Sequence, residues 1–335
     1  MKDIWNGASL RPDRPLVKRD YCWASELNKS MIDRYLTMNA VTPTNPPNAR
    51  SRRKFLAGNI WEDIQGIITS ALGLRTELQQ EVWTHGALSV KGKIDFMIQG
   101  MPDYSIARDK INKMPFSAEL NGYLLSVVDK FEQQIGQREF APMIRECKSC
   151  SEYVIDMIQE GGCVIGHKLQ LYHYLKGLNI PLGYVDYLSK NDALMEDTRV
   201  EYPDVELEDK YNRDLVALKG YLEAGEQPPK EPLIVFEGKF KKNFNVEYSS
   251  YLKLIYNFAE PLEYSNAVKS DIGRWNRVLL RIKDVEEGKQ TKTGKPILLT
   301  DKNKIVIAEM EQQGLNAFDL AKKAQIEDDD EAEET

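Results

Sequence analysis

The amino-acid sequence predicts an α/β fold in which helices flank a central mixed sheet. Between residues 55 and 72 apolar side chains recur every three or four positions, which indicates a helix. Residues 81–99 and 141–149 instead alternate apolar and polar side chains, which is typical of strands. A further helix is predicted at 166–178 and a further strand at 181–190. Helices and strands that alternate along a chain in this way favour a layered α/β domain.

The remaining segments are assigned from the same patterns. Beyond residue 265 the charge is dense and the helical pattern is interrupted. We predict helices at 20–39 and 209–224, a mostly helical region at 101–140 and a strand at 233–240.

The composition is that of a soluble globular protein. With 335 residues, 42% hydrophobic and 29% charged, the chain can bury a large core. Its apolar stretches are too short for a transmembrane helix, and the first residues lack the apolar region of a secretory signal. Four cysteines are too few for a disulfide framework, so we expect a cytoplasmic location.

The net charge of −7 comes from the last nine residues, 327–335, which carry seven acids and no base. The rest of the chain holds 45 basic and 45 acidic residues. We predict that this acidic tail is disordered, either as a solubilising end or as an arm that binds a protein partner. A neutral body still allows nucleic-acid binding, because a local basic groove is sufficient.

The chemistry-bearing residues follow one another in a fixed order along these elements. Glu146 and Lys148 end an apolar strand and point to the same face. Asp95 follows Gly-Lys-Ile in the preceding strand region, and the next helix carries Gln170 and Tyr174 four positions apart. Glu-x-Lys alone says little, because the sequence contains it four times. The ordered set is therefore more informative than any single member.

The segments GNIWE, KGKIDF, IRECKS and QLYHY resemble, in this order, the RecB-like branch of the PD-(D/E)XK nuclease superfamily. The resemblance spans about residues 50–260. Within the branch, the set of motifs is similar to that of exonucleases of CRISPR adaptation and phage recombination. The resemblance implies a restriction-endonuclease-like core at 50–265 with a helical insertion at about 101–140. The expected additions are a helical segment at 1–49, a helical or irregular extension at 266–326 and the tail at 327–335.

The resemblance implies a metal-dependent deoxyribonuclease, an exonuclease in DNA recombination, repair or phage DNA metabolism. Carboxylate oxygens suit Mg²⁺ or Mn²⁺, which neutralises charge on the phosphate that is cleaved. The expected ligands are Asp95, Glu146, the backbone carbonyl of Cys147 and Glu62. Lys148 is expected to orient the attacking water, to stabilise the transition state or, with a lowered pKa, to help deprotonate that water.

DNA is the expected partner, and we expect no binding to membranes. By the same resemblance, Gln170 and Tyr174 contact substrate or brace the lysine. Basic residues ahead of the helix that bears Glu62 are candidates for phosphate contacts, or equally for solvated surface. They are Arg50, Arg52, Arg53 and Lys54; Lys239, Lys241 and Lys242 form a second basic group. The oligomeric state is left open.

Three alternatives remain. Cys147, Cys150, Cys163 and His167 have the spacing of a zinc finger. Glu237 and Lys239 also follow an apolar run and are a second choice for the catalytic strand. The fold could also be a catalytically silent subunit that binds DNA or serves assembly. An iron–sulfur cluster is not expected, because no cysteine follows Cys163.

Overall fold

The chain folds into two compact units in the computed structural model, which describes residues 16–46, 49–190, 194–291 and 293–325. For residues 49–55, 57 and 75–78 only the backbone is described. Unit 1 comprises the described residues up to Thr42 and Pro46–Pro228; unit 2 comprises Pro43–Asn45 and those from Pro229 onward. No helix among the described residues is long and apolar enough to cross a membrane. The acidic tail lies outside the described residues.

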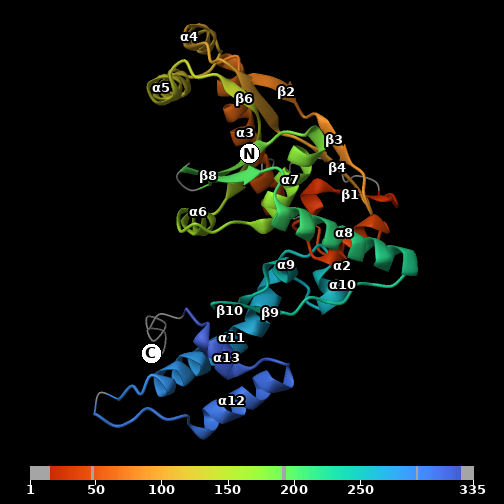
Figure 1. The fold of residues 1–335 in the computed structure, drawn as a ribbon, viewed down its shortest axis with the longest axis vertical. Coiled ribbons are helices and arrows are strands. Elements are labelled where there is room, and N and C mark those ends of the chain that lie inside the picture. The colour runs from red at the N-terminus through yellow and green to blue at the C-terminus, as the bar shows by residue number, and fades with distance from the viewer. Residues whose placement is uncertain (1–15, 47–48, 191–193, 292, 326–335) are drawn as a thin grey trace. The chain divides into compact units, whose positions relative to one another are not determined.

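A five-stranded mixed sheet forms the centre of unit 1 (Figure 1). Its first three strands pair antiparallel, the third and fourth pair parallel, and the last is antiparallel again. The order is β2 (Arg75–Leu78), β5 (Phe96–Gly100), β6 (Phe140–Cys150), β7 (Leu182–Ser189) and β8 (Met195–Glu201). Helices flank this sheet, so the predicted α/β class with a central mixed sheet is confirmed.

Two helices cover opposite faces of the central strand β6. α3 (Ala49–Ala71) contacts the face that carries Cys147, whose thiol donates a hydrogen bond to Gln65. α7 (Ile165–Leu178) contacts the other face, where Gln170 reaches Glu146. α6 (Glu152–Gln159) and α7 together make the crossover that a parallel β6–β7 pair requires, and α8 (Val205–Ala224) packs on α7.

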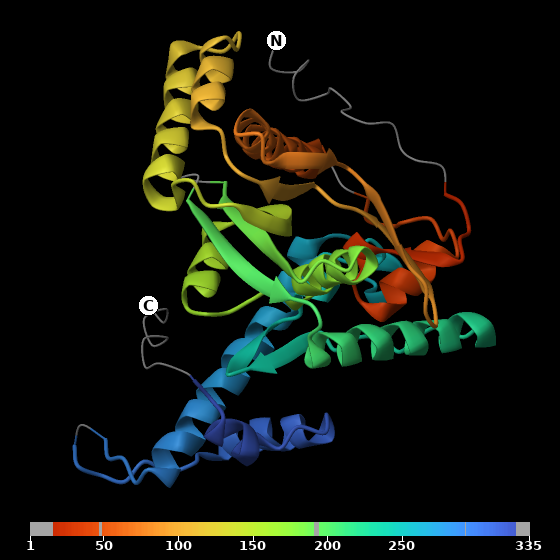
Figure 2. The same ribbon diagram turned by 45° about the horizontal axis from the view of Figure 1, so that its top comes forward.

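A second, three-stranded sheet lies in unit 1 with the order β1-β4-β3 (Figure 2). It is built from β1 (Tyr21–Trp23), β3 (Glu81–Thr84) and β4 (Ser89–Lys93). The two or three strands predicted within 81–99 are three, of which β5 belongs to the larger sheet. The prediction of one helix at 20–39 is wrong at its start. Pairing of β1 with β4 outweighs local helical preference, and helix α2 (Met31–Met38) begins only after Ser30, which caps it.

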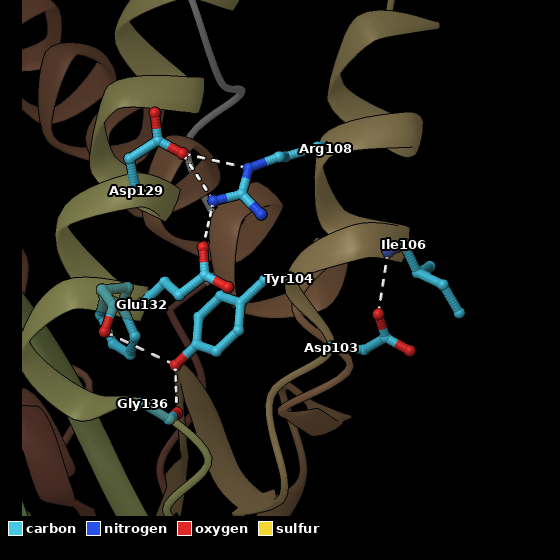
Figure 3. A network of polar contacts seen from close by, with 8 residues as sticks. Asp103, Tyr104, Ile106, Arg108, Asp129, Glu132 and Gly136 are labelled. Atoms are coloured by element: carbon cyan, nitrogen blue, oxygen red, sulfur yellow. Dashed lines mark hydrogen bonds and ion pairs between the residues drawn. The ribbon is translucent and has the colours of Figure 1, made fainter.

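The predicted insertion is a pair of helices, α4 (Tyr104–Asn112) and α5 (Ala118–Ile135), held together by polar contacts (Figure 3). Arg108 on α4 donates to Asp129 on α5 at 3.0 and 2.7 Å and also pairs with Glu132. The Tyr104 hydroxyl donates to the carbonyl of Gly136 at 2.6 Å. Since the arginine cluster is exposed, the buried Tyr104 and its apolar neighbours account for more of the stability of the pair.

Unit 2 has its own core, which packs Phe240 against Trp275 and Met310. The predicted strand at 233–240 is a hairpin that turns at Gly238, where φ is +73°. The sequence-based limit of the nuclease core, residue 265, falls inside α11, whereas the compact units divide at Pro228. The elements are β9 (Ile234–Glu237), β10 (Lys239–Lys242), α9 (Phe244–Glu247), α10 (Leu252–Tyr256), α11 (Pro261–Glu286), α12 (Asp301–Gln312) and α13 (Ala317–Lys322).

Gly166 lets α7 approach the segment around Asn28 closely. A Cβ at Gly166 would lie 2.1 Å from Cβ and 2.5 Å from Cα of Asn28, and the backbone there cannot yield cheaply. We expect Gly166→Ala to lower the free energy of unfolding by about 1–3 kcal/mol. In α8, where a Cβ at Gly220 meets nothing within 4 Å, Gly220→Ala is expected to stabilise by about 0.5–1 kcal/mol. Urea unfolding measures both, and equal effects would contradict the assigned packing.

Candidate active site

The ends of β4, β5 and β6 bring the predicted acids and lysine together. Asp95 lies between β4 and β5, and its Oδ2 accepts a hydrogen bond of 2.8 Å from the backbone N–H of Cys147. Cys147 separates Glu146 from Lys148 on β6, so Asp95 reaches the same short segment. Lys148 Nζ donates to Glu146 Oε1 at 2.6 Å, and Glu146 is only 2% exposed. Asp95 thus shares one site with Glu146 and Lys148, which lie about 50 residues further along the sequence.

Gln170 and Tyr174 support Glu146 from α7. Gln170 Nε2 lies 2.7 Å from Glu146 Oε1 and 3.0 Å from the Tyr174 hydroxyl. Both side chains are buried, at 5% and 2% exposed, and Gln170 contacts Glu146 from within the core; a contact of either with substrate stays a prediction. Gly92 makes room for this arrangement, because a Cβ there would lie 2.4 Å from the Tyr174 ring.

Glu146 is held in an environment that disfavours its charge. Burial, followed by the charge of Asp95, raises the pKa of Glu146 to about 8, although Lys148 opposes this shift. Its second oxygen, Oε2, is buried and has no hydrogen-bond partner. An unpartnered buried carboxylate oxygen is costly, so Oε2 can gain from a ligand that pairs with it.

Lys148 stays protonated in this site. Burial lowers its pKa, but the carboxylates of Glu146 and Asp95 outweigh that effect, so the pKa of Lys148 is raised. On the same side, burial and then the charge of Lys148 lower the pKa of His167 to about 3. His167 is therefore a neutral imidazole, and its Nδ1 lies 3.2 Å from the Tyr187 hydroxyl.

A buried ion pair, which the sequence analysis missed, supports the site from the opposite face of the sheet. Arg145 donates to Asp186 through Nε at 2.8 Å and through Nη2 at 2.6 Å. Burial raises the pKa of Asp186 to about 6, against the favourable charge of Arg145. The pair joins β6 to β7 beside Cys147, which lies opposite Asp186 in the ladder. The acid within the apolar run LGYVDYLS was the available signal.

A ligand role for Glu62 stays a prediction. Glu62 lies on α3 and accepts a hydrogen bond of 3.1 Å from Gln79, although its charge contributes to the raised pKa of Glu146. Across the described ranges, no three side chains of His, Cys, Asp and Glu converge closely enough to hold a metal ion. A ligand role for the Cys147 carbonyl stays a prediction.

The donor set still fits Mg²⁺ bound through two carboxylates. Mg²⁺ keeps several waters and takes one or two protein carboxylates together with substrate phosphates. Asp95 and the unpartnered Oε2 of Glu146 supply oxygens of this kind. The fit therefore rests on the chemistry of these two acids.

The zinc alternative does not agree with the strand geometry. Cys147 and Cys150 are three residues apart in β6 and so point to opposite faces of the sheet. Their thiols donate to Gln65 Oε1 at 2.8 Å and to the Leu188 carbonyl at 3.6 Å. All four cysteines are free. Because the faces differ, this cysteine pair cannot ligate one ion.

The other candidate residues belong to unit 2 or have side chains outside the described part of the chain. Arg50, Arg52, Arg53 and Lys54 belong to the first turns of α3, but their side chains lie outside the described part. Glu237 and Lys239 flank the turn of the β9–β10 hairpin, outside the five-stranded sheet. In the second basic group, Lys241 pairs with Glu237 and Lys242 with Glu247, which offsets much of its charge.

Comparison with known proteins adds little. No family model and no curated protein matches the sequence. One solved structure, "Crystal structure of SSO0001", is 13% identical with a TM-score of 0.38, covering 74% of this chain and 90% of that chain. A likeness at this level indicates neither fold nor function.

Proposed function

We propose that the protein is a metal-dependent DNA nuclease that hydrolyses phosphodiester bonds, with Asp95, Glu146 and Lys148 as its catalytic residues. The main support is the meeting of these side chains around a buried carboxylate oxygen that has no hydrogen-bond partner. Perturbed acids beside a charged lysine are typical of functional sites. The mixed sheet and the position of Gln170 on the crossover helix agree with the resemblance to RecB-like nucleases.

In this proposal Asp95 and Glu146 hold Mg²⁺ or Mn²⁺. The ion, when bound, neutralises phosphate charge and lowers the pKa of a coordinated water. Lys148 carries its proton, so its role is to donate hydrogen bonds to the phosphate and to stabilise the charge that develops there. The raised pKa of Lys148 speaks against a general-base role. Gln170 keeps Glu146 in place through Oε1 and leaves Oε2 available.

The action on DNA ends, the place in recombination, repair or phage DNA metabolism and the cytoplasmic location belong to the same proposal. The four free cysteines are consistent with a reducing compartment. A second candidate is a catalytically silent DNA-binding or assembly subunit. It is favoured by one observation, that Glu62 bonds Gln79 instead of completing a ligand set with Asp95 and Glu146.

Hydrolysis of labelled DNA tests the proposal directly. Purified protein is incubated with end-labelled linear, circular and single-stranded DNA, with Mg²⁺ or Mn²⁺ and with EDTA. We expect products only with the metal ion, and cleavage of linear but not circular DNA for an exonuclease. Binding without cleavage under every condition would instead support the silent subunit.

A further inference from the structure

One face of the three-stranded sheet in unit 1 gathers aromatic side chains. Tyr21 and Trp23 on β1, Trp83 on β3 and Lys91 on β4 point to this side, because the residues between them, such as Cys22, are buried on the other. Trp83 is 37% exposed and His85, which follows β3, is exposed as well. We refer to Tyr21, Trp23, Trp83, His85 and Lys91 as the aromatic face.

The rings of the aromatic face are fixed relative to one another. The Tyr21 centroid lies 5.8 Å from that of Trp23 and 5.3 Å from that of Trp83, and His85 stacks on Trp83 at 6.0 Å. Lys91 Nζ lies 4.8 Å from the Trp83 centroid and 5.4 Å from that of Trp23. Glu81 accepts from Trp83 Nε1 at 2.7 Å and from Lys91 at 2.9 Å. A ligand therefore meets rings that are already ordered.

Basic side chains border these rings. Lys18 and Arg19 precede β1, and Lys93 is exposed at the end of β4. Lys18, Arg19 and Lys219 line a shallow pocket next to Ser89, with Asp20 and Glu223 also in its wall. Glu81, the acid within the face, is already paired with Lys91. Arg19 pairs with Glu26 and Lys219 with Glu223, so the charge that favours an anionic chain with flat groups comes from Lys18 and Lys93.

Strand β4 links the aromatic face to the candidate active site. Lys91 points outward, Gly92 packs on Tyr174 on the inner side, and Asp95 follows two residues after Lys93. At roughly 3.3 Å per residue, Lys91 and Asp95 are about 13 Å apart along the chain. A nucleic-acid strand is long enough to touch both.

We propose that the aromatic face binds single-stranded nucleic acid by stacking unpaired bases on Trp83 and Tyr21, with phosphates held by Lys93. Stacking of bases on aromatic side chains tolerates any sequence and is strengthened by basic neighbours. The further role, delivery of the strand to Asp95 and Glu146, rests on the proposed nuclease function, whereas the binding does not.

Binding is measured by fluorescence anisotropy of a labelled oligo(dT), with EDTA present so that hydrolysis does not interfere. We expect Trp83→Ala and Tyr21→Ala each to raise Kd about 10-fold. Trp83→Phe is expected to keep most of the affinity. Tyr153→Ala, which removes an exposed tyrosine from α6, is the matched control and should leave Kd unchanged. Thermal unfolding establishes that each variant is folded.

Quenching of tryptophan fluorescence by oligo(dT) gives a second readout that does not need the alanine variants to fold. Quenching in the native protein that is largely lost in Trp83→Phe supports the proposal. An oligo(rU) arm distinguishes RNA from DNA as the source of the strand. The proposal would be overturned if the native protein and folded Trp83→Ala bound oligo(dT) with equal affinity. It would also be overturned if the native protein bound blunt duplex or an oligosaccharide more tightly than oligo(dT). If Trp83-dependent binding is found but no DNA is ever cleaved, only the nuclease function fails.

Discussion

Replacing Glu146 by Gln is expected to abolish DNA hydrolysis. The same change is expected to remove a loss of folding stability that occurs as the pH rises. In the proposed site the Glu146 carboxylate would hold the metal ion that neutralises phosphate charge, and its loss costs about 100-fold or more in rate. The folded-state pKa of about 8 lies above the ordinary value of 4.5. The folded protein therefore holds a proton that the unfolded chain has lost, and native stability declines as pH rises from about 4.5 to 8.

The glutamine variant lacks this titration. The difference in unfolding free energy, variant minus native, should therefore increase with pH by on the order of 2–4 kcal/mol across that interval. Urea unfolding at pH 5 and pH 8 measures it, alongside the DNA assay. Glu139→Gln, which alters an exposed acid just before β6, should change neither activity nor pH dependence. A Glu146→Gln variant that cleaves DNA at the native rate would remove Glu146 from the site.

The fold was predictable where one face of an element is buried and one is not. The strand predicted at 141–149 alternates along its length, and β6 agrees with it within a few residues. α7 agrees with the helix predicted at 166–178, although its residues are buried continuously from Leu169 to Leu175. β8 was missed because it is an edge strand whose exposed face makes MEDTRVE mostly polar. β1 was taken for a helix because three residues carry too little pattern, and only pairing with β4 defines them. Pairing partners far along the chain are invisible to a local window.

The candidate site was predictable in its residues but not in its electrostatics. Spacing along one strand and one helix identified Glu146, Lys148, Gln170 and Tyr174, because these relations are local. The position of Glu62 depends on how α3 lies across the sheet. In the structure Glu62 accepts a hydrogen bond from Gln79. The raised pKa of Lys148, likewise, results from a balance between burial and two carboxylates that only the folded arrangement sets. The sequence analysis had left open a lowered pKa for Lys148.

The Arg145–Asp186 pair is expected to be a sensitive ionic contact among the described residues of unit 1. Asp186 is 2% exposed, so removal of its partner by Arg145→Met leaves a carboxylate buried without compensation. We expect a loss of about 3–5 kcal/mol in unfolding free energy at pH 8. The native pKa of about 6 is already raised, and without Arg145 it rises further. Below pH 6 both folded proteins carry protonated Asp186, so the loss should largely disappear there.

Removing both partners separates the charge from the packing. An Arg145→Met, Asp186→Leu double variant buries no unpaired charge at this pair and should recover most of the stability at pH 8, and the part of the pH dependence that comes from Asp186 should disappear. Arg199 and Glu201 form an exposed pair on β8, at 60% and 58% exposed, so Arg199→Met should cost less than about 1 kcal/mol. Urea unfolding between pH 5 and 8 compares all three. If Arg145→Met loses the same stability at pH 5 as at pH 8, the penalty comes from lost packing, and the charged pair does not stabilise the junction of β6 and β7 beside the candidate active site.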